Sequence, residues 1–146
     1  QASYRWKGLD VSVSFRGAFG FDILNAYRMK YETLAWLSSF NVPKSAYQKI
    51  GEYYNFAPSI YSDRYIEPGD YVNLDTLTIG YTFDLSQRNK VIRSIRVFCT
   101  GMNLLTISGY SGLDPEVAIV GLTSGVDPIN KYPNLRSYII GASFNF

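Results

Sequence analysis

The last eleven residues, 136–146, alternate between two kinds of side chain and finish on an aromatic residue. One parity is small or polar, except for Ile139. The other parity is apolar and consists of Tyr138, Ile140, Ala142, Phe144 and Phe146. Because a strand sends alternate side chains to opposite faces, this segment predicts a strand with one apolar and one polar face. Eleven residues are also about the length that a tilted strand needs to cross a bilayer.

Such a strand is typical of an outer-membrane β-barrel, whose outer face meets lipid and whose inner face lines the lumen. The same alternation also fits an edge strand of a soluble β-sandwich. Three further segments have strand periodicity, namely 9–23, 71–84 and 92–106. The first has fifteen residues, which would span roughly 50 Å at the rise of a strand. That length exceeds the usual length of soluble strands and favours the barrel.

The connections between these strands are long, short and long. Residues 85–91 form a short polar turn, whereas 25–70 and 107–135 are rich in Tyr, Pro, Gly and Asn. Outer-membrane barrels have short periplasmic turns and long extracellular loops. We therefore expect an all-β fold of four antiparallel transmembrane strands, with extracellular loops at 25–70 and 107–135.

Composition excludes several classes of function. A net charge of +2 without a Lys/Arg cluster argues against nucleic acid as a partner. The chain has no His and only Cys99, so the usual parts of a Ser-His-Asp triad or a His–metal site are missing. We expect neither an enzyme nor a metal or other cofactor. No run of 18 apolar residues is present. The start at Gln1, without an initiating Met, leads us to expect a piece of a longer protein.

Several motifs, in order along the chain, resemble the SusC/RagA-type TonB-dependent outer-membrane transporters. They are FRGAFGFD at 15–22 with Asn25 and Arg28, IEPGDYVNLDTLTIGYTF at 66–83, IRVFCTGMNLLTI at 95–107, GYSGLDPE at 109–116, Tyr132-Pro133, Arg136-Ser-Tyr138 and GASFNF at 141–146. The resemblance covers nearly the whole chain and is weakest over 30–61. Several motifs in the correct order are more specific than any single one.

The resemblance implies that the chain holds the last four strands of a large barrel of about 22 strands with a plugged lumen. It implies import of an oligosaccharide or a peptide, with a SusD-like surface lipoprotein as lid and the TonB-ExbB-ExbD complex as energy source. The plug and the TonB-contacting segment would lie outside this chain. The family location is the bacterial outer membrane, with several strands in contact with lipid. The alternative is a soluble all-β carbohydrate-binding module that uses its tyrosines.

The predicted loop 25–70 contains a group of aromatic residues that could contact substrate. Flat rings suit sugar rings or peptide side chains. Packing within the loop, or a seat for the lid lipoprotein, explains the same residues. The predicted substrate-binding residues are Tyr47, Tyr53, Tyr54, Phe56, Tyr61 and Tyr65.

The family signature falls on Asn103, Gly112, Asp114, Pro115 and Glu116. Asp114 and Glu116, together with Asp127, could be interpreted as a cation site. A turn is the simpler explanation, because Asp-Pro favours turn initiation, and we expect no metal.

The resemblance also implies an assembly signal in the final strand. The barrel-assembly machinery would recognise the aromatic residues Tyr138, Phe144 and Phe146.

Overall fold

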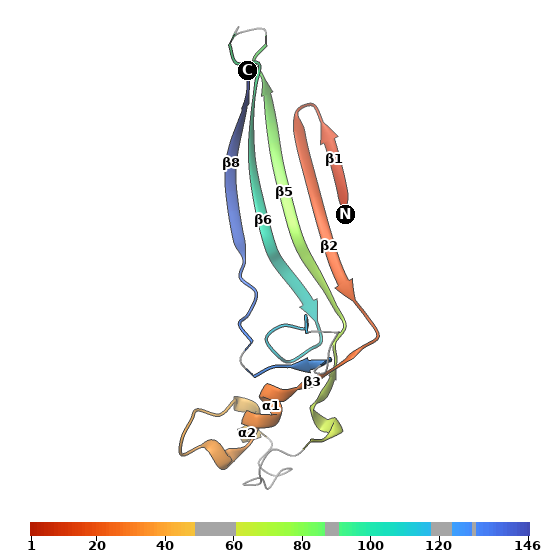
Figure 1. Cartoon of the computed structure of the whole chain (residues 1–146), viewed down its shortest axis with the longest axis vertical. Helices are drawn as coiled ribbons and strands as arrows, with labels where there is room; N and C mark the ends of the chain where they lie inside the picture. The colour runs from red at the N-terminus through yellow and green to blue at the C-terminus, as the bar shows by residue number, and fades with distance from the viewer. Residues whose placement is uncertain (49–60, 87–90, 118–123, 130) are drawn as a thin grey trace. The chain divides into compact units, whose positions relative to one another are not determined.

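The computed structural model describes residues 1–48, 61–86, 91–117, 124–129 and 131–146 (Figure 1). The chain divides into two compact units. Unit 1 comprises Gln1–Gly17, Tyr71–Ile107 and Asn134–Phe146, and unit 2 comprises Ala18–Asp70 and Ser108–Pro133.

Unit 1 is built on a five-stranded sheet with the order β1-β2-β5-β6-β8 (Figure 1). Its outer pairs, β1 with β2 and β6 with β8, are antiparallel. The strands are β1 (Ala2–Trp6), β2 (Leu9–Ala18), β5 (Tyr71–Asp84), β6 (Ser94–Ser108) and β8 (Ser137–Asn145).

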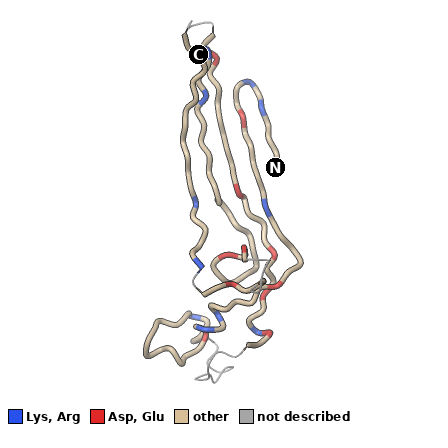
Figure 2. Tube along the Cα trace, viewed as in Figure 1, with Lys and Arg blue, Asp and Glu red and all other residues tan. Residues whose placement is uncertain are grey.

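The two faces of this sheet differ in chemistry. On one face Val11 lies opposite Tyr4, and Val97 lies opposite Ala142. The other face carries mainly hydroxyls, glycines and a few charges; the Thr78 and Thr100 hydroxyls, for example, lie 2.9 Å apart. Charged residues are sparse along these strands (Figure 2). Among the described residues of unit 1, no hydrophobic side chain is buried. The sheet is therefore a single layer with one apolar and one polar face, as a barrel wall requires.

β1 is a strand outside the four segments predicted from strand periodicity. It joins β2 through Lys7 and Gly8, which both have positive φ, of 44° and 91°. Two left-handed residues between paired strands define the tight hairpin turn that matches the twist of the strands. Gly8 also accepts a hydrogen bond from the backbone N–H of Thr82, at 2.8 Å, which fixes the turn against β5.

The long strand expected over 9–23 is divided in the structure. β2 ends at Ala18, and β3 (Asp22–Asn25) belongs to unit 2. Between them Gly20 has a φ of 76°, a left-handed conformation that breaks the extended chain. The other expected strands, 71–84, 92–106 and 136–146, correspond to β5, β6 and β8 within two residues at each end.

Unit 2 occupies the segments expected to be loops, and it contains a second small sheet. β3 pairs antiparallel with β4 (Ile66–Pro68) and parallel with β7 (Val126–Asp127). Unit 2 also contains short helices, namely α1 (Ala26–Tyr31), η1 (Leu34–Trp36), α2 (Lys44–Gln48) and η2 (Asp63–Tyr65). Among the described residues, no helix has the length and apolarity needed to span a membrane. In the described part of unit 2, the buried hydrophobic residues are Ile23, Ala26, Ala46, Tyr65 and Tyr110.

Candidate functional site

A polar network centred on Glu67 connects three segments of unit 2 that are far apart in the sequence. Oε1 of Glu67 accepts hydrogen bonds from Arg28 Nη1 at 2.8 Å, from Ser111 Oγ at 2.8 Å and from Asn25 Nδ2 at 3.3 Å. Oε2 accepts the backbone N–H of Ser111 at 2.9 Å. The β3–α1 junction, β4 and the segment after β6 are thereby held together.

Arg28 extends this network along α1. Its Nε donates to Glu32 Oε2 at 2.7 Å, in the i,i+4 spacing that brings side chains together on a helix. Arg64 Nη2 lies 3.5 Å from the same Glu32 oxygen. Two guanidinium groups and two carboxylates give the cluster a formal charge of zero. Asn25 caps α1, because its Oδ1 accepts the backbone N–H of Arg28 at 2.8 Å.

Burial and hydrogen bonding act in opposite directions on these ionisable groups. Burial alone would raise the pKa of Glu67, but hydrogen bonds from Arg28 and Ser111 outweigh it and hold the pKa below the ordinary value of 4.5. Burial likewise opposes the charge of Arg28, but its bonds to Glu67 and Glu32 raise the Arg28 pKa. Both groups are therefore charged at neutral pH.

A pocket of about 460 Å³ lies beside this network, within unit 2. That volume is in the usual range for small-molecule sites. Tyr27 and Pro43 form an apolar part of the pocket wall, and Ser45 lines the pocket from the start of α2. The lining residues are Asn25, Tyr27, Arg28, Glu32, Pro43, Ser45, Ser111 and Gly112.

Gly112, one of the predicted signature residues, has a steric role next to Tyr110. A Cβ at position 112 would lie 2.3–2.5 Å from the Tyr110 ring, so only glycine fits without displacement of the ring. The Tyr110 hydroxyl donates to Asp127 Oδ2 at 2.6 Å. Burial, followed by this bond to a carboxylate, raises the pKa of Tyr110. The pair joins the segment after β6 to β7.

Asp114, Pro115 and Glu116 form a turn that encloses an ammonium group. Asp114 Oδ1 accepts the backbone N–H of Glu116 at 2.9 Å. Lys131 Nζ donates to the carbonyl oxygens of Asp114, at 3.2 Å, and Glu116, and lies 3.7 Å from Asp114 Oδ2. Asp127 accepts from Tyr110 instead. The cation held by this turn is therefore Lys131, and the described residues contain no group of three or more metal-ligating side chains.

The predicted aromatic residues that the structure describes differ in exposure. Tyr65 is 7% exposed, with the Arg64 guanidinium 5.2 Å from its ring, so it packs inside unit 2. Tyr47 and Tyr61 are exposed. Tyr53, Tyr54 and Phe56 lie outside the described residues.

Tyr27, whose ring lines the pocket, was not among the predicted site residues, and neither was most of the polar network, namely Glu32, Glu67 and Ser111. The Asn25, Arg28 and Glu32 spacing, which places a cap and an ion pair on one short helix, is the signal that could have found part of it.

In unit 1, Asn103 has a φ of 51° and its Nδ2 donates to the carbonyl of Leu135 at 3.3 Å. Asn tolerates the left-handed conformation better than most residues, which suits it to this position. The predicted assembly residues Tyr138, Phe144 and Phe146 are all exposed.

An ion pair spans the polar face of unit 1. Arg96 on β6 reaches over β5 to Asp10 on β2, with Nε and Nη2 at 2.9 and 2.5 Å from the two carboxylate oxygens. It passes over Gly80, where a Cβ would lie 2.7–2.8 Å from both side chains. The pair explains how charge is accommodated on this face.

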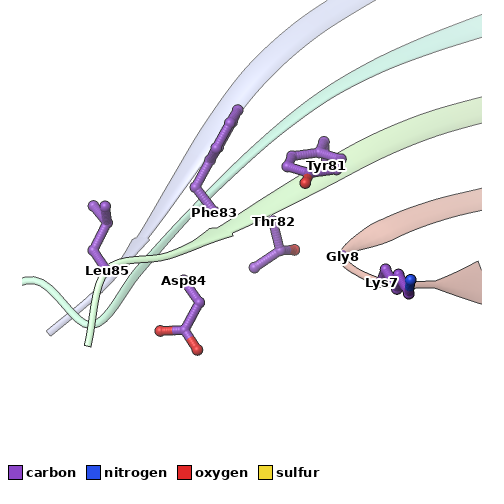
Figure 3. A pocket seen from close by; sticks show the side chains of 7 residues that line it. All are labelled: Lys7, Gly8, Tyr81, Thr82, Phe83, Asp84 and Leu85. Carbon is purple, nitrogen blue, oxygen red and sulfur yellow. The ribbon is translucent and has the colours of Figure 1, made fainter. Parts of the chain in front are cut away.

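A second hollow lies at the turn end of the same sheet. It has a volume of about 700 Å³ and is lined by the β1–β2 turn and the last residues of β5. In Figure 3, Tyr81, Phe83 and Leu85 project to one side of β5, whereas Thr82 and Asp84 project to the other. The alternation of the two faces therefore continues to the end of the strand.

Known proteins resemble this chain in sequence over most of its length. TonB-dependent receptor P3 of Formosa agariphila is 26% identical over 97% of this chain and 15% of its own length. TonB-dependent receptor SusC of Bacteroides thetaiotaomicron is 34% identical over 58% of this chain and 8% of its own length. The chain thus spans under one sixth of these relatives. No protein-family model matches it.

Solved structures share the fold. The RagAB peptide importer in its closed-closed state gives a TM-score of 0.71 at 24% identity, over 97% of this chain and 16% of the solved chain. The open-open state gives a TM-score of 0.72 at 23% identity over the same shares. The relatives carry the name of receptors, and the single-layer sheet has the two faces of a barrel wall. In sequence and in fold the chain is therefore similar to a barrel segment of the SusC/RagA-type TonB-dependent receptors.

Proposed function

We propose that the protein containing this chain imports an oligosaccharide or a peptide across the bacterial outer membrane. The observation that carries the proposal is the sheet of unit 1, whose apolar face is exposed and whose opposite face carries hydroxyls and a bridging ion pair. Lipid would cover the apolar face, and the polar face would line the lumen. The chain would contribute several membrane crossings to the barrel.

The segments of unit 2 would then form ordered loops on the extracellular side. Their polar network and pocket give them a fixed internal structure, and long ordered loops usually have a function. The exposed rings of Tyr47 and Tyr61 would face the substrate or the lid. The described residues provide support and recognition, and we assign them no chemical step.

Three partners follow from this proposal. A SusD-like lipoprotein would close over the extracellular loops, in line with the SusC and RagAB names of the similar proteins. The TonB-ExbB-ExbD complex would supply energy through a part of the protein outside this chain. The barrel-assembly machinery would recognise the final strand through Tyr138, Phe144 and Phe146.

A soluble carbohydrate-binding sandwich is the alternative that the sequence left open. A sandwich buries one face of each sheet beneath a second sheet. In the described part of unit 1, large apolar side chains such as Ile140, at 80% exposed, and Phe15, at 59%, are uncovered. The structure therefore favours the barrel wall over the sandwich.

Uptake in intact cells tests the proposed function. Cells that lack the protein and matched wild-type cells are given labelled oligosaccharides and labelled peptides, with and without a proton uncoupler. We expect one substrate class to enter only the wild-type cells, and to stop entering when the uncoupler removes the energy source. Equal uptake of every substrate by both strains would contradict the proposal.

A further inference from the structure

We propose that the pocket beside α1 receives an apolar side chain of a peptide substrate. This inference rests on the proposed import function and assigns peptide as the substrate class. The pocket lies wholly within unit 2, between α1, residues 43–45 and residues 111–112.

The wall of the pocket is suited to an apolar group. The Tyr27 ring is 45% exposed and packs against Tyr31, with the two ring centroids 4.9 Å apart. Pro43 lies among the lining residues and adds a rigid apolar surface. A volume of about 460 Å³ accommodates a side chain as large as that of leucine or phenylalanine.

Among the residues that the structure describes, the floor of the pocket carries no net charge. The guanidinium groups of Arg28 and Arg64 are matched by the carboxylates of Glu32 and Glu67, at 2.7–3.5 Å. A charged ligand group would find no unmatched opposite charge and would lose its hydration on entry. The electrostatics therefore favour an uncharged group.

The polar atoms of the floor also bond chiefly to one another. Asn25 is 1% exposed and is engaged through both Nδ2 and Oδ1. Ser111 Oγ donates to Glu67 and accepts from Asn25. A sugar ring would bring several hydroxyls that need partners, and a buried hydroxyl without a partner is costly. An apolar side chain brings no such requirement.

One donor remains for the peptide backbone. Among the described residues, the hydrogen bonds of Arg28 use Nε and Nη1, which leaves Nη2 directed to none of them. Because Arg28 lines the pocket, Nη2 can donate to the carbonyl of the residue whose side chain enters it. Apolar contact would then provide affinity, and this bond would fix orientation.

The test is binding to the full-length protein, purified in detergent, measured by calorimetry. The probes are the uncharged peptides acetyl-Gly-Gly-Phe-Gly-Gly-amide and its Ala counterpart, with maltoheptaose as the sugar. Burial of a phenylalanine side chain predicts about tenfold tighter binding, or more, of the Phe peptide. Tyr27→Ala removes the wall, and Ser45→Phe fills the pocket from α2. Each variant should remove the preference for Phe.

Phe40→Ala is the matched control, since Phe40 is an exposed ring of unit 2 outside the pocket. It should retain the preference. Equal binding of both peptides, binding of maltoheptaose that is sensitive to Tyr27→Ala, or a preference unaffected by both pocket variants would overturn the inference. Uptake by intact cells separates the two proposals. If wild-type cells take up a substrate that cells without the protein do not, and the pocket variants leave this uptake unchanged, only this inference is overturned. If wild-type cells take up no more substrate than cells without the protein, the proposed function is rejected as well.

Discussion

At the scale of single residues, glycines decide how closely the segments of unit 2 approach one another. Gly69 follows β4, and its N–H donates to the carbonyl of Phe21 at 2.8 Å. A Cβ at this position would lie 2.4 Å from the Phe21 ring and 2.8 Å from Ile23, which is fully buried. Ile23 cannot move without disturbing the core of unit 2.

Gly69→Ala should therefore destabilise unit 2 by about 1–3 kcal/mol, the usual cost of overpacking a core. Hydrogen exchange of the peptides that cover β3 and α1 would measure this loss as faster exchange. Gly109→Ala is the matched control, because a Cβ at position 109 meets nothing within 4 Å. Equal exchange in the two variants would show that the contact at Gly69 is loose.

Glu67 should make the stability of unit 2 depend on pH in the acid range. Because the folded pKa of Glu67 lies below its ordinary value of 4.5, its stabilising contribution is complete above that value. The contribution is lost as the pH falls through the lowered pKa. Unit 2 should therefore become more sensitive to an acid-tolerant protease below about pH 4.5, and Glu67→Gln should flatten this dependence.

Asp22→Asn is the control for this experiment, since Asp22 is an exposed carboxyl on the neighbouring strand β3. It should leave the acid response of the wild-type protein in place. An acid response that persists unchanged in Glu67→Gln would place the sensitive group elsewhere.

At the scale of elements, the β1–β2 hairpin depends on its two-residue turn. Gly8 has a φ of 91°, and a Cβ there would lie 2.7 Å from the backbone oxygen of Thr82. Gly8→Ala should destabilise the hairpin by about 1–3 kcal/mol, the range for a strained backbone. Lys7→Asn should be neutral or stabilising, because Asn is favoured at the first position of this turn. Heat-dependent loss of the compact barrel band on gels measures both effects.

The last strand provides a second prediction at this scale. Phe146 is 72% exposed, and Tyr138 and Phe144 are exposed on the apolar face of β8. If the barrel-assembly machinery recognises these rings, Phe146→Ala should reduce the amount of assembled protein in the outer membrane. Ser143→Ala, on the polar face of the same strand, should not. Normal surface levels of Phe146→Ala would argue against this role.

At the scale of the whole molecule, the chain consists of two units with different architectures. Unit 1 has no buried hydrophobic side chain in its described part, whereas unit 2 has a small core and a buried polar network. A single-layer sheet with two open edges exposes unpaired backbone groups, which lipid does not tolerate. Unit 1 therefore requires further strands, which agrees with relatives of which this chain covers about one sixth.

An immunoblot of fractionated source cells, with antibody against residues 25–70, tests this conclusion. We expect a band several times larger than the 16.5 kDa of this chain, in the outer-membrane fraction. A 16.5 kDa band in a soluble fraction would instead support a separate β-sheet binding module. Outer-membrane porins and soluble periplasmic proteins, followed on the same blot, control the fractionation.

The sequence by itself determined the sheet of unit 1. The alternation of apolar and polar side chains that marks a strand is a local pattern. The observed bounds of β5 are therefore the predicted ones, and those of β6 and β8 lie within two residues of their predicted bounds. The family motifs could be recognised for the same reason, because each motif is a local stretch of sequence. The β1 strand was not predicted because its hairpin turn depends on two residues in the left-handed conformation. One of them is Lys7, and lysine does not signal such a turn.

Only the tertiary structure decided unit 2 and its site. Asn25, Glu67 and Ser111 are 42–86 residues apart in the chain and meet through hydrogen bonds that no local pattern contains. The same holds for the end of the first strand at Ala18, since β3 pairs with β4 and β7 from distant segments. Alternation determines which face a side chain occupies, whereas contacts between distant segments are set by the packing of the whole unit.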